Sequence, residues 1–171
     1  MIEHSGGIMV YKYVSDRLKV MLVHPGGPFW EKKDEAAWSI PKGLQEEGES
    51  ILDTAKREFK EETGYDIQKE LVKLGTIRQP SKKLVTAFAV EMDLDEKKVK
   101  SNYFEMEWPP KSGNIQEFPE NDRAQWFSVE DARKKLFKGQ RGFIDKLVEM
   151  LKYQETKKTE EPEYVQMSLF D

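Results

Sequence analysis

A cluster of charged residues between positions 43 and 65 has the spacing needed for metal chemistry. In this stretch, GLQEEGESILDTAKREFKEETGY, the acids Glu58, Glu61 and Glu62 recur three and four residues apart. On a helix these spacings place all three carboxylates on one side, where like charges repel and lower helix stability. A hard divalent cation such as Mg²⁺ would offset the repulsion, because it takes oxygen ligands and bridges carboxylates to substrate phosphates. The spacing therefore indicates either a metal site or a solvated acidic helix face.

The helical register favours the metal site over the solvated face. Ser50 is expected to cap the helix at its N-terminus, and Gly64 is the expected C-terminal stop. Glu58 and Glu62 adjoin the apolar stripe of this helix and do not lie opposite it. Acids in that position are held by the core and still reach solvent. The stripe consists of Ile51, Leu52, Ala55 and Phe59.

The sequence around this helix predicts an α/β fold with a mixed sheet. Residues 109–123 are predicted to form a long irregular loop, which in a compact domain is usually functional. Apolar and β-branched runs predict strands at 7–14, 18–24, 37–40, 71–78, 84–93, 102–108 and 125–129. Amphipathic patterns predict further helices at 128–138 and 143–153. We therefore expect one domain over residues 1–153, followed by a charged linker and terminal peptide at 154–171.

Composition excludes several other kinds of site. The chain has no cysteine and only two histidines, so disulfides, thiolate zinc sites and cysteine nucleophiles are excluded. A formal net charge of −4 argues against general nucleic-acid binding. The N-terminus does not read as a signal peptide, and no apolar run approaches about 20 residues, the length of a membrane span. We therefore expect a cytoplasmic protein without membrane association.

The stretch from Gly43 to Tyr65 resembles the Nudix box, G-x5-E-x7-R-E-U-x-E-E-x-G-U, in which U is a bulky apolar residue. Every fixed position is filled, and the one mild departure is the aromatic Tyr65 where an aliphatic residue is commoner. The resemblance extends over roughly residues 5–153. It implies the Nudix fold, an α/β/α sandwich with a mixed β-sheet and a loop–helix–loop at the box. It also implies a hydrolase that uses Mg²⁺ or Mn²⁺ to cleave nucleoside diphosphates linked to another moiety.

The resemblance also assigns roles to individual residues of the box. Glu58 and Glu62 would be the principal metal ligands, with Glu61 as a third and the carbonyl of Gly43 as a backbone ligand. A carboxylate would take a proton from the attacking water, and which glutamate does so stays open. The alternative is a Nudix-fold binding module without turnover. Its usual sign is loss of box carboxylates, and all of them are present here.

Further acids and one base complete the candidate catalytic set. Arg57, paired with Glu49, would orient the carboxylates. A late acid in this family often lies in a loop before a tryptophan strand, and Glu120, six residues before Trp126, fits that position. Glu117 is the near rival. The catalytic candidates are therefore Glu49, Arg57, Glu61 and Glu120.

Residues outside the box are the candidates for substrate binding. The lead-in Trp38 to Gly43, WSIPKG, resembles that of Nudix hydrolases acting on dinucleoside polyphosphates and diphosphoinositol phosphates. Lys42 would contact a phosphate, and Trp30 and Tyr103 are available to stack on a base. The favoured substrate is a nucleoside polyphosphate, either a diadenosine polyphosphate or an NTP. ADP-ribose, nucleotide sugars and diphosphoinositol phosphates are the alternatives.

The C-terminal peptide Gln166–Phe170, QMSLF, is similar to the pentapeptide that docks bacterial proteins on the sliding clamp, with Met167 in place of leucine. It follows a charged segment, KKTEEPE, that is typical of a flexible linker. A flexible tether that presents Leu169 and Phe170 is what a pocket-docking peptide requires. The alternative is that the peptide packs against its own domain.

Overall fold

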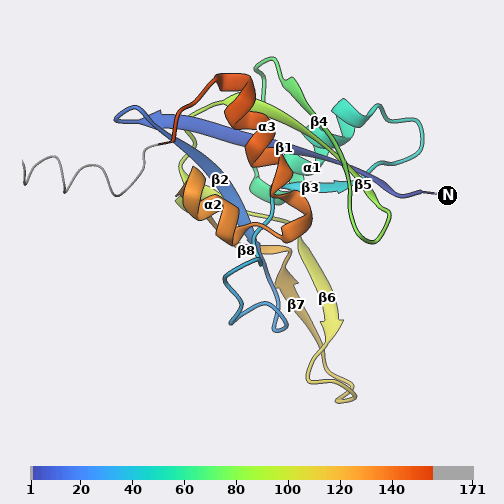
Figure 1. Ribbon diagram of the computed structural model, residues 1–171. Helices are drawn as coiled ribbons and strands as arrows, with labels where there is room; N and C mark the ends of the chain where they lie inside the picture. The colour runs from blue at the N-terminus through green and yellow to red at the C-terminus, as the bar shows by residue number, and fades with distance from the viewer. Residues whose placement is uncertain (1, 156–171) are drawn as a thin grey trace, which may run out of the picture.

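A mixed β-sheet forms the centre of the fold in a computed structural model that describes residues 2–155 (Figure 1). Its strands are β1 (His4–Val14), β2 (Arg17–Pro25), β3 (Lys42–Leu44), β4 (Val72–Arg78), β5 (Leu84–Glu91) and β8 (Asn121–Ser128). They lie in the order β4-β5-β1-β2-β8, and β3 pairs with the start of β1. β1 runs parallel to β5 and antiparallel to β2 and β3. The docking peptide predicted at 166–170 lies outside the described residues.

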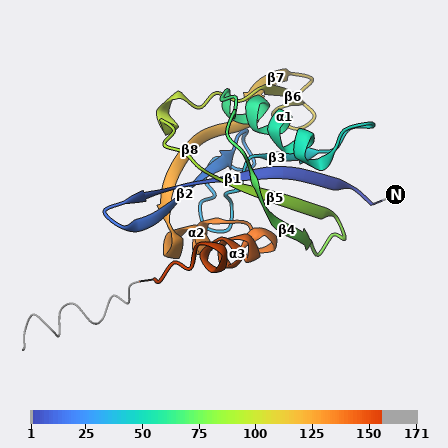
Figure 2. The same cartoon turned by 90° about the horizontal axis from the view of Figure 1, so that it is seen from above.

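Helices cover both faces of this sheet. The helices are α1 (Ile51–Thr63), α2 (Val129–Lys135) and α3 (Gly142–Leu151), with short 3₁₀ turns η1 (Glu96–Lys98) and η2 (Lys138–Gln140). Figure 2 shows α1 on one face and both α2 and α3 on the other. This arrangement confirms the predicted α/β/α sandwich. None of the helices in the described part of the chain is long and apolar enough to cross a membrane.

The two cores follow from the alternation of side chains along β1. Ile8 and Val10 are fully buried beneath α1, together with Ala55 and Phe59 of that helix. Met9 points to the opposite face, where it belongs to the cluster that includes the fully buried residues of α3. Successive residues of a strand face opposite sides, so a strand buried on both faces is apolar throughout. β1 is therefore the strand around which both layers pack.

The signals that predict α1 are found where they were expected. The Ser50 hydroxyl accepts a hydrogen bond from the Asp53 backbone N–H at 3.1 Å, which is an N-cap. Gly64 has a φ of 82°, a left-handed conformation that glycine adopts without strain, and its N–H bonds the Lys60 carbonyl. The helix therefore begins and ends at fixed points. That fixes the rotation of its acidic side chains toward the sheet.

The strand predicted at residues 37–40 is wrong. Residues in this segment form only isolated bridges, among them Ser39 with Val23 of β2, and the strand itself is β3 at Lys42–Leu44. The apolar run before the proline suggested a strand, but the chain changes neighbours there, leaving β2 and joining β1. The predicted strand is therefore displaced toward the box.

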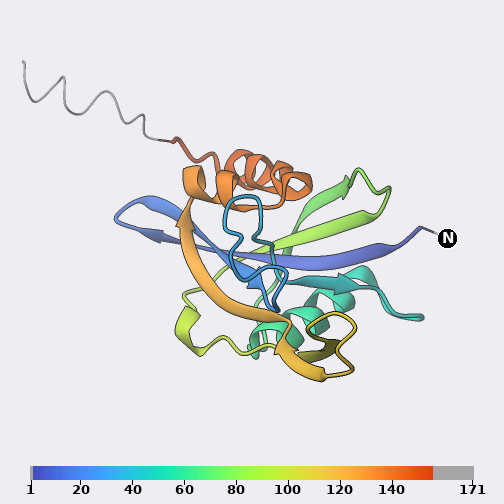
Figure 3. The same cartoon turned by 90° about the horizontal axis from the view of Figure 1, so that it is seen from below.

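The irregular loop predicted at residues 109–123 is also wrong. β6 (Tyr103–Glu107) and β7 (Ile115–Pro119) form a separate hairpin, and β8 starts at Asn121. The hairpin extends from the body in Figure 1 and lies on the α1 side of the sheet in Figures 2 and 3. Phe104 faces Phe118 across it, with ring centroids 6.0 Å apart. This cross-strand aromatic contact stabilises the hairpin.

Candidate active site

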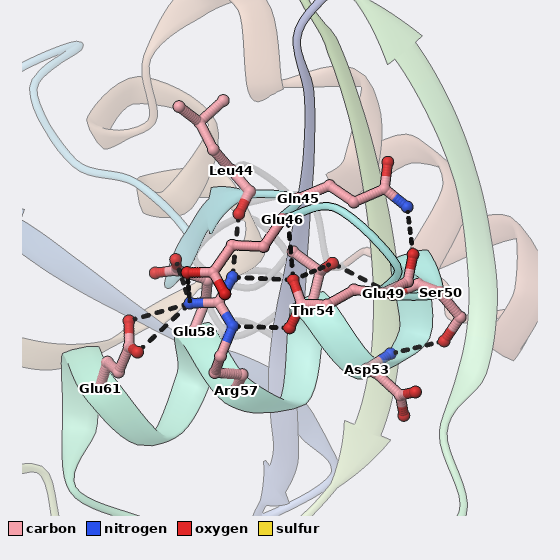
Figure 4. Close-up of polar contacts among 10 residues, drawn as sticks. All are labelled: Leu44, Gln45, Glu46, Glu49, Ser50, Asp53, Thr54, Arg57, Glu58 and Glu61. Atoms are coloured by element: carbon pink, nitrogen blue, oxygen red, sulfur yellow. Dashed lines mark hydrogen bonds and ion pairs between the residues drawn. The ribbon is translucent and has the colours of Figure 1, made fainter.

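The guanidinium of Arg57 is the centre of the acidic cluster on α1 (Figure 4). Its Nε and Nη2 atoms donate to the two carboxylate oxygens of Glu49 at 2.7 and 3.0 Å. Its Nη1 atom donates to Glu58 at 2.9 Å and to Glu61 at 3.2 Å, and Nη2 also reaches the Leu44 carbonyl at 2.9 Å. One cation therefore holds three carboxylates and the end of β3 in a fixed arrangement. The structure brings together the base and the acids that the box spacing singled out.

Glu49 is the anchor of this arrangement. The hydrogen bond from Arg57 lowers the pKa of Glu49 to about 2, and bonds from the Glu46 N–H and the Thr54 hydroxyl act in the same direction. Glu49 therefore remains ionised at any pH well above 2. A permanent anion at this point keeps the guanidinium oriented toward the helix.

Glu62 joins α1 to two strands. Its side chain is buried, with a residue exposure of 8%, and its Oε2 atom accepts from the Lys42 N–H at 2.8 Å. Its Oε1 atom accepts from Nδ2 of Asn121, the first residue of β8, at 2.7 Å. Burial raises the pKa of Glu62 to about 7, against the effect of both hydrogen bonds. The sequence interpretation missed Asn121, although its place directly after the candidate acid Glu120 was a usable signal.

Gly43 leaves the space that the Glu58 carboxylate occupies. A Cβ atom at Gly43 would lie 2.0 Å from Cδ of Glu58, which no side chain tolerates. Glycine therefore allows the carboxylate to lie directly against the backbone of β3, beside the carbonyl expected to bind metal. Burial raises the pKa of Glu58, and the nearby charge of Glu61 adds to the increase.

The structure separates the two rival late acids. Glu120 lies between β7 and β8, and its N–H bonds the Asn102 carbonyl at 2.8 Å, while the Asn102 N–H bonds the Glu61 carbonyl at 2.9 Å. Burial and the charge of Glu61 raise the pKa of Glu120. Glu117 is exposed on β7. Of the two, Glu120 is the acid that lies near the cluster.

The donor set fits a hard divalent cation. Glu58, Glu61, Glu62 and Glu120 supply oxygen atoms only, the ligands that Mg²⁺ prefers. Within residues 2–155, no three acidic or histidine side chains already form a complete cation site. Glu58 and Glu61 both accept hydrogen bonds from Arg57. An ion held here would complete its shell with water and phosphate oxygens, which is the usual coordination of Mg²⁺.

The predicted substrate residues lie in three different environments. Lys42 lines a cavity of about 430 Å³ together with Phe137 and Lys138, neither of which was predicted to have a functional role. The ring of Trp30 packs edge-on against Phe137 at 5.3 Å and is partly buried against the core, so it is committed to packing. Tyr103 is 64% exposed on β6, next to the Asn102 that bonds the Glu61 backbone. The structure therefore does not bring Lys42, Trp30 and Tyr103 into one pocket.

The raised pKa of Glu62 predicts that the metal-free protein loses stability as pH rises. The pKa is about 7 in the folded state and 4.5 in a free side chain, so folding favours the protonated form. This contribution is fully present below pH 4.5 and is lost as pH rises to about 7. In urea unfolding with EDTA, we expect Glu62→Gln to match the wild type closely at pH 4.5 and to be about 3 kcal/mol more stable at pH 8. A difference that does not change with pH would contradict this origin.

Comparison with known proteins agrees with the fold and the box. Residues 6–147 match the NUDIX domain family, so the chain belongs to the Nudix family. The match covers most of the sequence, and the chain is a Nudix pyrophosphohydrolase domain, in a family that typically uses a divalent metal. Among proteins with curated descriptions, none matches the sequence.

Several solved structures share this fold at low sequence identity. A Caenorhabditis elegans Ap4A hydrolase in a binary complex has a TM-score of 0.61 and 19% identity, covering 86% of this chain and 98% of that one. The NUDIX domain of Shewanella oneidensis NrtR, complexed with ADP ribose, has a TM-score of 0.60 and 18% identity, covering 88% and 89%. The MutT protein from Methanosarcina mazei Go1 has a TM-score of 0.59 and 19% identity, covering 88% and 96%. At these identities the likeness establishes the fold and leaves the substrate open.

Proposed function

We propose that this chain uses Mg²⁺, or Mn²⁺, to cleave a diphosphate linkage in nucleoside polyphosphates. The favoured substrates are dinucleoside polyphosphates such as diadenosine tetraphosphate, or NTPs. The observation that carries the proposal is the position of Lys42, whose backbone N–H bonds Glu62 while the residue lines the cavity that contains Lys138. A phosphate chain placed along β3 would have carboxylates for a cation on one side and two lysines on the other.

The two faces of β3 explain how one strand serves both needs. A Cβ on Gly43 would meet Glu58 of α1. Lys42, the residue before Gly43, is paired with Gly7 of β1, and a Cβ on Gly7 would lie 2.7 Å from Cβ of Lys42. Consecutive residues of a strand face opposite sides, so Gly43 faces α1 and the Lys42 side chain faces away from it. The Lys42 ammonium forms no ion pair among the described residues, so it would be available to bind phosphate beside the acidic cluster.

The proposed roles follow from these positions. Glu58, Glu61 and Glu62 would hold the cation with the Gly43 carbonyl, and bound Mg²⁺ would stabilise negative charge on the phosphates. Arg57 orients Glu58 and Glu61 through its Nη1 atom. Glu61 and Glu120 are the candidates to accept the proton from water. The raised pKa of Glu120 brings it nearer to the working pH, where a general base is most effective.

Two alternatives stay open because the structural neighbours point to different ligands. One neighbour is an Ap4A hydrolase, and another is a NUDIX domain complexed with ADP ribose. Nucleotide sugars and diphosphoinositol phosphates belong to the same group of alternatives. A binding module without turnover is disfavoured by the complete carboxylate set of the box.

A substrate panel with Mg²⁺ tests the proposal. We expect diadenosine tetraphosphate or an NTP to be hydrolysed with a kcat/KM at least about tenfold above that of ADP-ribose, a ratio that corresponds to about 1.4 kcal/mol. Products separated by ion-exchange chromatography also identify the cleaved bond. Faster hydrolysis of ADP-ribose would favour the alternative substrate. Binding of every compound without hydrolysis would favour the binding module.

A further inference from the structure

The chain changes its strand partner just before the active-site strand β3. Ser39 exchanges two backbone hydrogen bonds with Val23 of β2, each 2.9 Å long, whereas Lys42 is paired with Gly7 of β1. Ile40 lies at the crossing, and its N–H donates to no backbone carbonyl of β1 or β2. A buried N–H without a partner is costly, so the crossing needs an acceptor from elsewhere.

Gln140 supplies that acceptor from the turn η2, one hundred residues further along the chain. Its Oε1 atom accepts from the Ile40 N–H at 3.0 Å, and its Nε2 atom donates to the Ser39 hydroxyl at 2.9 Å. The Ser39 hydroxyl in turn donates to the Ile40 carbonyl at 2.6 Å. Gln140 is 1% exposed, so these bonds are shielded from water. A glutamine provides one acceptor and one donor in the same plane, which matches both demands.

The crossing leads directly into the acidic cluster. Two residues after Ile40, the Lys42 N–H bonds Glu62 at 2.8 Å, and Gly43 follows with its backbone against the Glu58 carboxylate. A shift of the crossing would therefore move both backbone contacts of the proposed metal site. Gln140 itself has no hydrogen bond to Glu58 or Glu62 in the described chain.

We infer that Gln140 is a positioning residue for the active site, which holds the Ser39–Ile40 crossing so that β3 presents Lys42 and Gly43 correctly to the acidic cluster. Gln140 also lines the cavity beside Lys42, so the same side chain forms part of the cavity wall. The inference rests on the proposed roles of Glu62 and Gly43. It adds a determinant that lies far from the box in the sequence.

Other contacts keep the turn in place without Gln140. The Phe137 N–H bonds the Trp38 carbonyl at 2.8 Å, and the Ala36 and Trp38 N–H groups bond the carbonyls of Lys134 and Lys135 at 2.9 and 2.8 Å. Loss of the glutamine bonds therefore loosens the crossing without detaching the segment that follows α2. This separates a positioning role from a purely structural one.

The test compares Gln140→Met with a matched buried control. Methionine has a similar length and forms neither bond. We expect it to weaken Mn²⁺ binding in the absence of substrate about tenfold, and to lower kcat about tenfold on the best substrate of the panel. Thr86→Val removes a buried hydroxyl on β5 that bonds His4 and Thr76. β1 separates Thr86 from β3, and its hydroxyl bonds neither Ser39 nor Ile40, so this variant should leave both quantities unchanged. Electron paramagnetic resonance measures free Mn²⁺, and urea unfolding measures the stability of both variants.

Ser39→Ala provides a milder second variant, because it removes the hydroxyl that bonds Gln140 Nε2 and the Ile40 carbonyl but keeps the bond from the Ile40 N–H to Gln140. We expect Mn²⁺ binding to be about threefold weaker and kcat to be about threefold lower than in the wild type. The inference is overturned if Gln140→Met keeps wild-type Mn²⁺ affinity and kcat, or, should that variant not fold, if Ser39→Ala does so. Failure of the proposed function is distinct from this outcome, because it would appear in the wild type, as faster hydrolysis of ADP-ribose or as binding of every compound without hydrolysis.

Discussion

Glu62→Gln should lower kcat by about 10³-fold at saturating Mg²⁺, equivalent to about 4 kcal/mol of transition-state stabilisation. The substitution removes a charge that lies between β3 and β8 and leaves the shape of the side chain unchanged. Asn121 can rotate its amide so that its oxygen accepts from the new glutamine, and the Lys42 N–H keeps an oxygen acceptor. The packing is therefore preserved while the proposed metal ligand loses its charge. Steady-state hydrolysis of the best panel substrate measures the effect.

Stability separates loss of chemistry from loss of folding in this variant. Without metal at pH 8, Glu62→Gln should be more stable than the wild type, because burial of the carboxylate is unfavourable. Added Mg²⁺ should raise the unfolding midpoint of the wild type, since a ligand that binds the folded state stabilises it, and should leave that of the variant nearly unchanged. An inactive protein that is also more stable has not lost its activity by unfolding.

Glu117→Gln is the matched control for this prediction. Glu117 is an exposed acid on β7, three residues from Glu120 in the same part of the chain. Its neutralisation should leave kcat within about twofold of the wild type, because exposed charges interact weakly across solvent. Wild-type kcat in Glu62→Gln, or an equal loss of kcat in both variants, would contradict the proposed role of Glu62 as a metal ligand.

The sequence predicts α1 and its chemistry because their determinants are local. The Ser50 cap, the Gly64 stop and the spacing of Glu58 and Glu62 all lie within a single helix and its ends. A helix relates residues three and four apart directly, so side-chain neighbours follow from spacing alone. Arg57 contacts Glu58 and Glu61 on the same helix, so these pairs also follow from local spacing. Its bond to Glu49 needs in addition that the loop before the helix returns to the helix surface.

The remaining features depend on contacts between distant segments, which no local pattern encodes. The β6–β7 hairpin exposes Tyr103 and Ile115. Its Phe104 packs against Gly27, in the loop that follows β2. The bond from Asn121 to Glu62 and that from Ile40 to Gln140 span 59 and 100 residues. Polar residues in such positions look like ordinary loop residues in the sequence. Only the fold shows that they complete or position the site.

Arg57→Met should destabilise the metal-free protein by about 3 kcal/mol and lower kcat by about 100-fold. Only a quarter of the Arg57 side chain is exposed, and its loss leaves the partly buried acids Glu49 and Glu58 without their shared cation. The Leu44 carbonyl also loses its donor, so β3 is less firmly held. Urea unfolding in EDTA and steady-state kinetics measure the two effects.

Arg133→Met is the matched control, because Arg133 also joins two acids, but these acids are more exposed. The side chains of Asp145 and Glu155 are 69% and 33% exposed, compared with 18% and 14% for Glu49 and Glu58. Exposed ion pairs contribute little, so this change should cost less than about 1 kcal/mol and leave kcat unaffected. Equal losses of stability in the two variants would show that the ion pairs of Arg57 contribute no more to stability than those of Arg133.

Divalent metal distinguishes an orienting role of Arg57 from simple charge balance. Mn²⁺ should raise the unfolding free energy of Arg57→Met by at least as much as that of the wild type, because the ion replaces part of the missing positive charge. The kcat should stay low even when Mn²⁺ saturates, since a spherical ion does not fix the directions of Glu58 and Glu61 as the planar guanidinium does. Full recovery of kcat at saturating Mn²⁺ would show that Arg57 supplies only charge. Recovery of stability without turnover would show that the geometry of the carboxylates, and not their neutralisation alone, is what the arginine contributes to hydrolysis.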